Sequence, residues 1–239
     1  MDTLNKLNID IYADGSSLEN IIDLKKEKYI KGFTTNPSLM KQIGVVDYED
    51  HCKKILKEVT VDPVSIEIFT DDFNEMIKQA EYISSWGENV NIKIPITNSF
   101  GESSKSVIEN LVKKNIKLNI TAIFTIKQIE EILEVVEGLD FCILSYFAGR
   151  VADTGIDPEI ELIKIKEYLS NENASSLLLW ASSRELLNIF QAERSGCDII
   201  TVSHELLSKI DLINKNLDDF SLDTVKMFRD DALKAGFKL

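Results

Sequence analysis

A lysine stands in the middle of a strongly apolar segment, Asn91-Ile92-Lys93-Ile94-Pro95-Ile96. Lysine is rarely buried without a charge partner or a chemical role. Burial favours the neutral amine over the ammonium ion, and a neutral amine attacks carbonyl carbon to form a Schiff base. Two other interpretations stay open. The amine of an edge-strand lysine reaches water, or the lysine pairs with the carboxylate of Glu67.

Charged residues near the ends of other apolar segments suit the same chemistry. Asp14 and Glu67 are carboxylates on different predicted strands, where they are candidates for general acid–base catalysis. Taken alone, Asp14 is more typical of the N-cap of a following helix. Arg150 and Arg184 follow two later strands, and with Ser182 they suit phosphate binding beside helix N-termini. Taken singly, each arginine is also compatible with a solvated surface position.

Uncharged polar residues occupy corresponding positions. Thr34 with Asn36, and Asn119 with Thr121, are two residues apart, so each pair shares one face of its strand. Ser145 lies in another apolar run. Polar side chains at the C-terminal ends of parallel strands are typical of a catalytic pocket.

Eight short runs rich in Ile, Val, Leu or Phe, each followed by polar or turn residues, predict eight strands. They span residues 8–14, 30–36, 64–70, 90–96, 116–122, 141–147, 176–181 and 198–202. Apolar residues three and four apart predict helices between them. Clear examples span residues 71–86, 125–136 and 158–169, the last with Asp157 as N-cap and Pro158 at its first position.

The alternation of strands and helices predicts a parallel α/β sheet. Eight units in 239 residues fit a single (β/α)8 TIM barrel, which typically takes about 250 residues. We expect one domain over residues 1–239. An open doubly wound sheet is the alternative, but it usually has a Gly-rich phosphate turn after its first strand. Helical patterns at 204–216 and about 222–235 follow the last strand, the second being an extra C-terminal helix.

Composition narrows the possible partners and the compartment. Lys and Arg number 27 and Asp and Glu 40, which gives a net charge of −13. Such a chain repels phosphate backbones and anionic lipids, so we expect neither nucleic-acid nor membrane binding. No apolar run approaches the roughly 20 residues that span a bilayer, and the N-terminus lacks the apolar core of a signal peptide. We expect a cytoplasmic protein.

Six segments, taken together, resemble the transaldolase family. They are Tyr12-Ala13-Asp14-Gly15, Gly32-Phe33-Thr34-Thr35-Asn36-Pro37-Ser38, Ile92-Lys93-Ile94-Pro95, Asn119-Ile120-Thr121-Ala122-Ile123-Phe124, Ser145-Tyr146-Phe147-Ala148-Gly149-Arg150 and Trp180-Ala181-Ser182-Ser183-Arg184. They occur in the family's order and span nearly the whole chain. The second and fifth segments are the most specific.

The resemblance implies a (β/α)8 barrel in which Lys93 forms a Schiff base with a ketose phosphate, without a metal or an organic cofactor. It implies that Asp14 is the acid/base for carbon–carbon cleavage, and that Glu67 and Thr121 hold a catalytic water. The donors would be fructose 6-phosphate or sedoheptulose 7-phosphate, and the acceptor an aldose phosphate. The residues implied to bind these phosphorylated sugars are Thr34, Asn36, Asn119, Ser145, Phe147, Arg150, Ser182 and Arg184.

The same family contains fructose-6-phosphate aldolases, which usually have Gln at the position of Glu67 and Tyr at the position of Phe147. The residues present here favour transfer of a dihydroxyacetone unit over simple cleavage. The alternatives are such an aldolase, an enzyme of a specialised sugar pathway, or a non-catalytic phosphosugar-binding barrel. Tyr146 and Trp180 depart from the family pattern, so the acceptor sugar is open.

The resemblance also implies a homo-oligomer, because small family members often assemble through a C-terminal helix. Residues 222–239 would then contact a neighbouring copy. Val225, Phe228, Leu233 and Phe237 are the candidate contacts. The alternative is a helix that closes the bottom of its own barrel.

Overall fold

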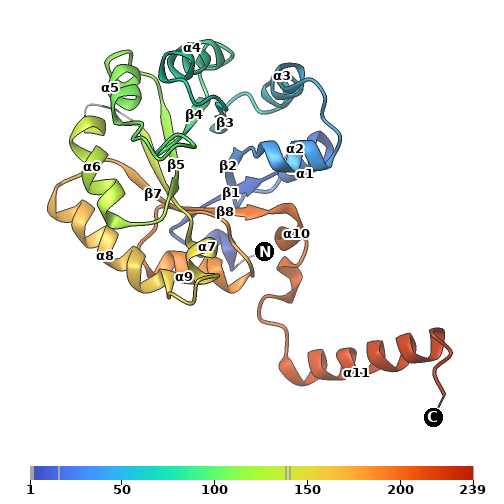
Figure 1. The fold of residues 1–239 in the computed structure, drawn as a ribbon. Coiled ribbons are helices and arrows are strands. Elements are labelled where there is room, and N and C mark those ends of the chain that lie inside the picture. The colour runs from blue at the N-terminus through green and yellow to red at the C-terminus, as the bar shows by residue number, and fades with distance from the viewer. Residues whose placement is uncertain (1–2, 16, 138, 140, 239) are drawn as a thin grey trace.

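Eight parallel strands form a closed barrel in sequence order, with the last strand paired to the first (Figure 1). This computed structural model describes residues 3–15, 17–137, 139 and 141–238, so Leu239 of the predicted C-terminal segment lies outside it. The strands are β1 (Asp10–Asp14), β2 (Ile30–Thr34), β3 (Val64–Glu67), β4 (Val90–Pro95), β5 (Leu118–Ile123), β6 (Cys142–Tyr146), β7 (Leu177–Trp180) and β8 (Ile199–Ser203). All eight predicted strands are confirmed, as is the TIM barrel.

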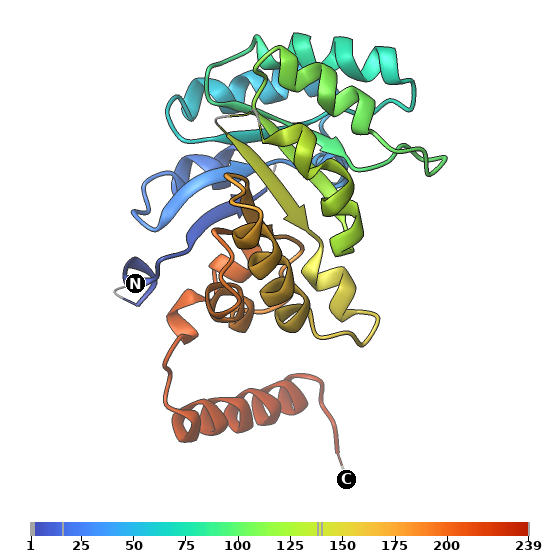
Figure 2. The same cartoon turned by 90° about the vertical axis from the view of Figure 1, so that its left-hand side faces the viewer.

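Helices connect successive strands and surround the barrel (Figures 1 and 2). They are α1 (Leu18–Leu24), α2 (Pro37–Gln42), α3 (Tyr48–Glu58), α4 (Phe73–Ser84), α5 (Lys105–Lys113), α6 (Ile126–Val136), α7 (Ala148–Ala152), α8 (Pro158–Asn171) and α9 (Leu187–Arg194). A short 3-10 helix, η1 (Leu4–Lys6), precedes β1. The predicted Asp157 N-cap and Pro158 start of α8 are confirmed, since the Asp157 side chain accepts the backbone N–H of Glu159.

Most of the apolar core lies between the strands and the surrounding helices. Strand side chains alternate between the two faces of the sheet. Ile92 and Ile94 therefore point outward into this layer, where both are fully buried. Lys93, between them, points into the barrel, where it lines a cavity. The same alternation turns the acidic and polar residues of neighbouring strands inward.

The inside of the barrel has an apolar part and a polar part. Tyr12, Ile143, Leu179, Ala181 and Ile199 form a separate apolar cluster contributed by β1, β7 and β8, by β6, and by the residue after β7. The buried polar residues of the interior come mainly from the strands opposite. They are Thr34, Ser65, Asn91, Lys93, Asn119, Thr121 and Ser145, together with Thr201 of β8.

Two glycines permit close contacts that shape this interior. A Cβ at Gly32 would lie 2.6 Å from ring atoms of Tyr12, so the aromatic ring packs directly on the β2 backbone. A Cβ at Gly149 would lie 1.7 Å from the Ser182 carbonyl oxygen. Close approach of this kind requires the absence of a side chain. The second contact holds the start of α7 against the loop that follows β7.

The chain after β8 differs from the prediction. The single helix predicted over 204–216 is instead α10 (His204–Leu207) and the 3-10 turn η2 (Ile210–Leu212). Asn214 has a φ of 63°, a left-handed conformation that ends helical geometry. The side chain of Asn216 then accepts the N–H groups of Asp218 and Asp219 and starts a new helix.

That helix, α11 (Leu217–Lys234), starts five residues before the predicted boundary and has no buried residue. It lies apart from the barrel in both views (Figures 1 and 2). The alternative in which it closes the bottom of its own barrel is therefore wrong. Its apolar side chains face solvent, and Phe228 is 64% exposed. Among the described residues, no helix has the length and apolarity to cross a bilayer.

Candidate active site

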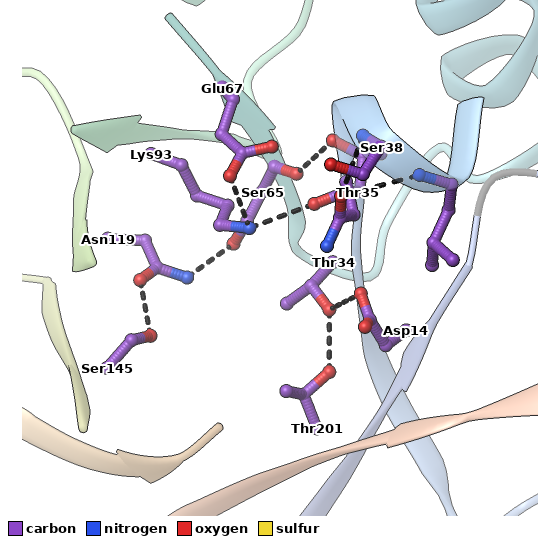
Figure 3. Close-up of polar contacts among 12 residues, drawn as sticks. Asp14, Thr34, Thr35, Ser38, Ser65, Glu67, Lys93, Asn119, Ser145 and Thr201 are labelled. Carbon is purple, nitrogen blue, oxygen red and sulfur yellow. Dashed lines mark hydrogen bonds and ion pairs between the residues drawn. The ribbon is translucent and has the colours of Figure 1, made fainter. Parts of the chain in front are cut away.

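The amine of Lys93 lies inside the barrel with two oxygen partners (Figure 3). Its Nζ donates to the backbone carbonyl of Thr35 at 2.9 Å and lies 3.1 Å from Glu67 Oε1. Lys93 is 8% exposed. A closed barrel has no edge strand, so the interpretation of Lys93 as an edge lysine is wrong. The pairing with Glu67 is confirmed, and the amine lies among polar atoms because its flanking isoleucines face the other way.

Glu67 joins this amine from the C-terminal end of β3, directly opposite Lys93 in the register of β3 and β4. Burial raises the pKa of the Glu67 carboxyl, the charge of Lys93 opposes that rise, and the charge of Asp14 adds to it. Glu67 Oε2 and Thr121 Oγ1 are buried and have no hydrogen-bond partner among the described residues. Both atoms can therefore bind a small polar molecule.

Asp14 lies at the C-terminal end of β1 and belongs to a chain of hydroxyl groups. Thr34 Oγ1 donates to Asp14 Oδ1 at 2.9 Å, and Thr34 and Thr201 share a hydrogen bond of 2.6 Å (Figure 3). Because the Thr34 proton points to Asp14, Thr201 donates to Thr34. Burial raises the pKa of Asp14, whereas the charge of Lys93 and the Thr34 hydrogen bond lower it. The α1 N-cap is Ser17, so the N-cap interpretation of Asp14 is wrong.

A second polar chain crosses the floor of the barrel interior. Ser145 Oγ donates to Asn119 Oδ1 at 2.6 Å, and Asn119 Nδ2 donates to Ser65 Oγ at 3.0 Å (Figure 3). Asn119 is fully buried. These bonds fix which way its amide points, because the oxygen and the nitrogen each have a defined partner.

A cavity of about 70 Å³ opens above these residues. Its walls include most of the predicted site, and the lining residues are Asp14, Thr34, Asn36, Lys93, Thr121, Ser145, Phe147, Arg150, Leu179, Ala181, Ser182 and Thr201. Asn36 is also the N-cap of α2, and its Oδ1 accepts the N–H groups of Ser38 and Leu39. Glu67 and Asn119 are not among these lining residues, but each contacts one of them, Glu67 through Lys93 and Asn119 through Ser145. Larger hollows of about 450 to 560 Å³ lie elsewhere, but none contains Lys93.

The two arginines differ in their surroundings. Arg150 lines the cavity, and its guanidinium lies 5.7 Å from the centre of the Phe147 ring. Arg184 does not line the cavity, because its guanidinium forms a 2.6 Å ion pair with Asp153 at the surface. Arg184 nevertheless lies close to the backbone of Gly149, next to Arg150. The two cations therefore stand near one rim of the barrel.

Unusual backbone conformations occur beside this cavity. Ala122, next to Thr121, has a φ of 59°, and Ser182 has a φ of 64°. Left-handed conformations are unfavourable for residues other than glycine and cluster at functional sites. The Ala122 position coincides with an irregularity in the pairing of β5 with β6. Thr121, next to Ala122, and Ser182 itself both line the cavity.

Two residues of this arrangement were missed in the sequence. Thr201 is 7% exposed and connects to Asp14 through Thr34, and Ser65 receives the Asn119 amide. A polar residue in an apolar strand was the available signal in both cases. Ser65 also stands two positions before Glu67, on the same face of its strand. Among the described residues, no group of three or more His, Cys, Asp or Glu is arranged to hold a metal ion.

Comparison with known proteins identifies the family of the chain. Residues 11–239 match the family described as Transaldolase/Fructose-6-phosphate aldolase. A "Probable transaldolase" of Maridesulfovibrio salexigens is 30% identical over 223 residues, covering 92% of this chain and 99% of that protein. A "Probable transaldolase" of Methanococcus vannielii is 32% identical over 215 residues, covering 89% and 93% respectively.

A solved structure supports the fold alone. Dihydrodipicolinate synthase from Rhodopseudomonas palustris superposes with a TM-score of 0.57 at 14% identity, covering 95% of this chain and 80% of that chain. The family match spans nearly the whole barrel, including the strands that carry Asp14, Glu67 and Lys93. The chain therefore belongs to the transaldolase/fructose-6-phosphate aldolase family.

Proposed function

We propose that this protein is a Schiff-base transaldolase that moves a dihydroxyacetone unit from a ketose phosphate to an aldose phosphate. The observation that carries the proposal is the buried Lys93 amine at a cavity, 3.1 Å from Glu67 and within the electrostatic reach of Asp14. A nucleophilic amine beside two carboxylates is what imine formation and acid/base chemistry require. The relatives named transaldolase support the same activity.

The first half of the reaction forms the imine. Lys93 Nζ attacks the C2 carbonyl of the ketose phosphate and gives a carbinolamine. Glu67 and Thr121 hold a water that carries a proton to the C2 hydroxyl, which leaves as water. Their unpartnered Oε2 and Oγ1 atoms are available for this task. The product is a protonated imine, which draws electrons from the adjacent bond.

The second half breaks and remakes a carbon–carbon bond. Asp14 takes the proton of the C4 hydroxyl, the C3–C4 bond breaks, and the aldose phosphate leaves. The electron pair of that bond remains on the three-carbon unit as an enamine bound to Lys93. This unit attacks the aldehyde carbon of the acceptor, and Asp14 returns its proton to the new hydroxyl. Hydrolysis of the imine then frees the amine.

Transfer requires that the enamine is not protonated before the acceptor arrives. The apolar walls of Leu179, Ala181 and Phe147 limit water near it. Asn36, Asn119, Thr34 and Ser145 hold the hydroxyl groups of the three-carbon unit. Phe147 offers no proton, unlike the Tyr usual in the aldolase branch, and this difference favours transfer.

One assay separates the two enzyme candidates and the non-catalytic barrel. The protein is incubated with fructose 6-phosphate, with and without erythrose 4-phosphate. A transaldolase forms sedoheptulose 7-phosphate only when both are present. Release of free dihydroxyacetone without transfer would favour the aldolase, and the absence of any product would favour a binding protein.

Lys93→Met should abolish turnover, because methionine has a similar length but no amine. We expect kcat to fall at least about 10⁴-fold, since a covalent intermediate can no longer form. Lys117→Met is the matched control. Lys117 directly precedes β5, its amine donates to the Glu88 carbonyl, and it does not line the cavity. Transfer assays and thermal melts measure both variants. Retained activity in folded Lys93→Met would contradict the assignment.

The rate should fall at acidic pH as Asp14 becomes protonated. Burial raises the pKa of Asp14 and the Thr34 hydrogen bond lowers it. Thr34→Val removes a bond to the charged form, so the pKa should rise and activity should be lost at a higher pH than in the unmodified protein. Thr154→Val is the control, because its hydroxyl binds only the Val151 carbonyl. If kcat/KM falls at the same acidic pH in Thr34→Val and in the unmodified protein, either Asp14 is not the acid/base or its hydrogen bond to Thr34 does not set its pKa.

Arg150→Ala should weaken binding of the phosphate group. Charge-assisted hydrogen bonds contribute about 1.5–3 kcal/mol, so we expect KM for fructose 6-phosphate to rise roughly 10- to 100-fold. KM for unphosphorylated fructose as donor should change little. Arg194→Ala provides the control, because Arg194 pairs with Glu159 on the outer helices. Equal effects on the phosphorylated and unphosphorylated donors would place the phosphate elsewhere.

The protein also forms a homo-oligomer through α11 in this proposal. The helix leaves its own barrel and exposes a series of large apolar side chains. They are Leu217, Leu222, Val225, Met227, Phe228 and Leu233, each at least half exposed. An apolar surface of this kind is typical of a protein interface.

A charge on that surface should dissociate the oligomer. Phe228→Asp places a carboxylate in the proposed interface, where its desolvation is unfavourable. Lys226→Gln changes the net charge equally and is the control. Light scattering after size exclusion should give the single-chain mass only for Phe228→Asp. A single-chain mass for the unmodified protein would contradict the proposed assembly.

A further inference from the structure

The hydrogen-bond ladder between β2 and β3 is interrupted where the Lys93 amine lies. Phe33 N–H donates to the Pro63 carbonyl at 2.8 Å, and Thr35 N–H donates to the Ser65 carbonyl at 3.0 Å. In a parallel pair, the next bond would run from Glu67 N–H to the Thr35 carbonyl. The Thr35 carbonyl instead accepts Lys93 Nζ at 2.9 Å. A backbone acceptor of the sheet has thus been made available to the amine.

Tyr48 supplies the missing partner. Its hydroxyl accepts Glu67 N–H at 3.1 Å and donates to the Glu67 carbonyl at 2.9 Å. One phenol therefore binds both backbone polar groups of the residue whose side chain pairs with Lys93. Buried backbone groups need such partners, since an unsatisfied one is costly.

The Tyr48 ring is held firmly enough to do this. Tyr48 is the first residue of α3, and the Asp47 side chain caps that helix. The ring packs edge-on against Phe69, with centroids 5.0 Å apart. Burial raises the pKa of the phenol far above its usual range, so the hydroxyl keeps its proton and remains a donor.

We propose that Tyr48 is a positioning residue that holds Glu67 in place and keeps the Thr35 carbonyl free for Lys93. This inference rests on the proposed Schiff-base function. Without the hydroxyl, Glu67 N–H has no partner and competes with the Lys93 amine for the Thr35 carbonyl. The strands then gain one ladder bond, and the amine and carboxylate lose their mutual arrangement.

Tyr48→Phe tests this directly, because it removes only the hydroxyl. A small misplacement of reacting groups costs up to about 100-fold in rate, so we expect kcat to fall about 10- to 100-fold while KM changes less than about twofold. Tyr82→Phe is the matched control. Its hydroxyl binds Glu49 on the neighbouring surface and does not touch Glu67. Equal rates for Tyr48→Phe and the unmodified protein would overturn the inference.

A double-mutant cycle separates positioning from a general loss of stability. If Tyr48 acts through Glu67, Tyr48→Phe should slow imine formation about twofold or less when Glu67→Gln is already present. Undiminished slowing in that background would contradict the positioning of the Glu67 carboxylate by Tyr48, because Glu67→Gln leaves only the backbone competition for the Thr35 carbonyl in place. Should thermal melts show Tyr48→Phe to be unfolded, Phe69→Leu loosens the ring from an exposed position. It should then reduce kcat about two- to fivefold without raising KM, and an unchanged kcat would overturn the inference.

Borohydride trapping distinguishes this failure from failure of the proposed function. Reduction with fructose 6-phosphate should label the unmodified protein quickly and Tyr48→Phe slowly. Equal labelling rates would reject the role of Tyr48 alone. No labelling of the unmodified protein would reject the Schiff-base function and, with it, this inference.

Discussion

The site depends on the contact of one amine with two oxygens inside the barrel. Lys93 Nζ binds the carbonyl of Thr35, the residue after β2, and the Glu67 carboxylate of β3, while Lys93 itself belongs to β4. Three adjacent strands thus meet at a single nitrogen. The contact exists because β2 and β3 stop pairing just before it, which leaves a backbone carbonyl for the side chain. The other polar residues of the cavity surround this nitrogen.

The barrel interior has an apolar part and a polar part, and the Lys93 amine lies in the polar part. Apolar side chains from β1, β6, β7 and β8 fill one part, with the Tyr12 ring lying on Gly32. Hydroxyl and amide chains from β2 to β6, with Thr201 of β8, fill the other. Each buried chain orients a group that carries chemistry in the proposed mechanism, because Thr34 directs Asp14 and Ser145 directs Asn119. Arg150 lines the same cavity, and Arg184 lies next to it near the rim of the barrel.

Periodicity made much of this fold predictable from sequence. Runs of branched apolar residues predicted all eight strands, and polar residues within those runs predicted half of the residues that line the cavity. The position of a residue along a strand does not reveal its hydrogen-bond partners. The Thr35 carbonyl as a partner of Lys93, the role of Thr201 and the bridging by Tyr48 were therefore missed. The prediction of one helix over 204–216 was wrong. It relied on the spacing of apolar residues, which does not reveal the break into α10 and η2 or the left-handed backbone of Asn214. The Arg184–Asp153 pair depends on loop geometry that no motif encodes.

The most direct measurement identifies the lysine that carries the substrate. The protein is reduced with borohydride in the presence of fructose 6-phosphate, digested, and its peptides are sequenced by mass spectrometry. If Lys93 forms the Schiff base, one reduced adduct is expected, on the peptide that contains Lys93, and none when the ketose phosphate is omitted. An adduct on a different lysine, or no adduct on a folded and substrate-saturated protein, would contradict it.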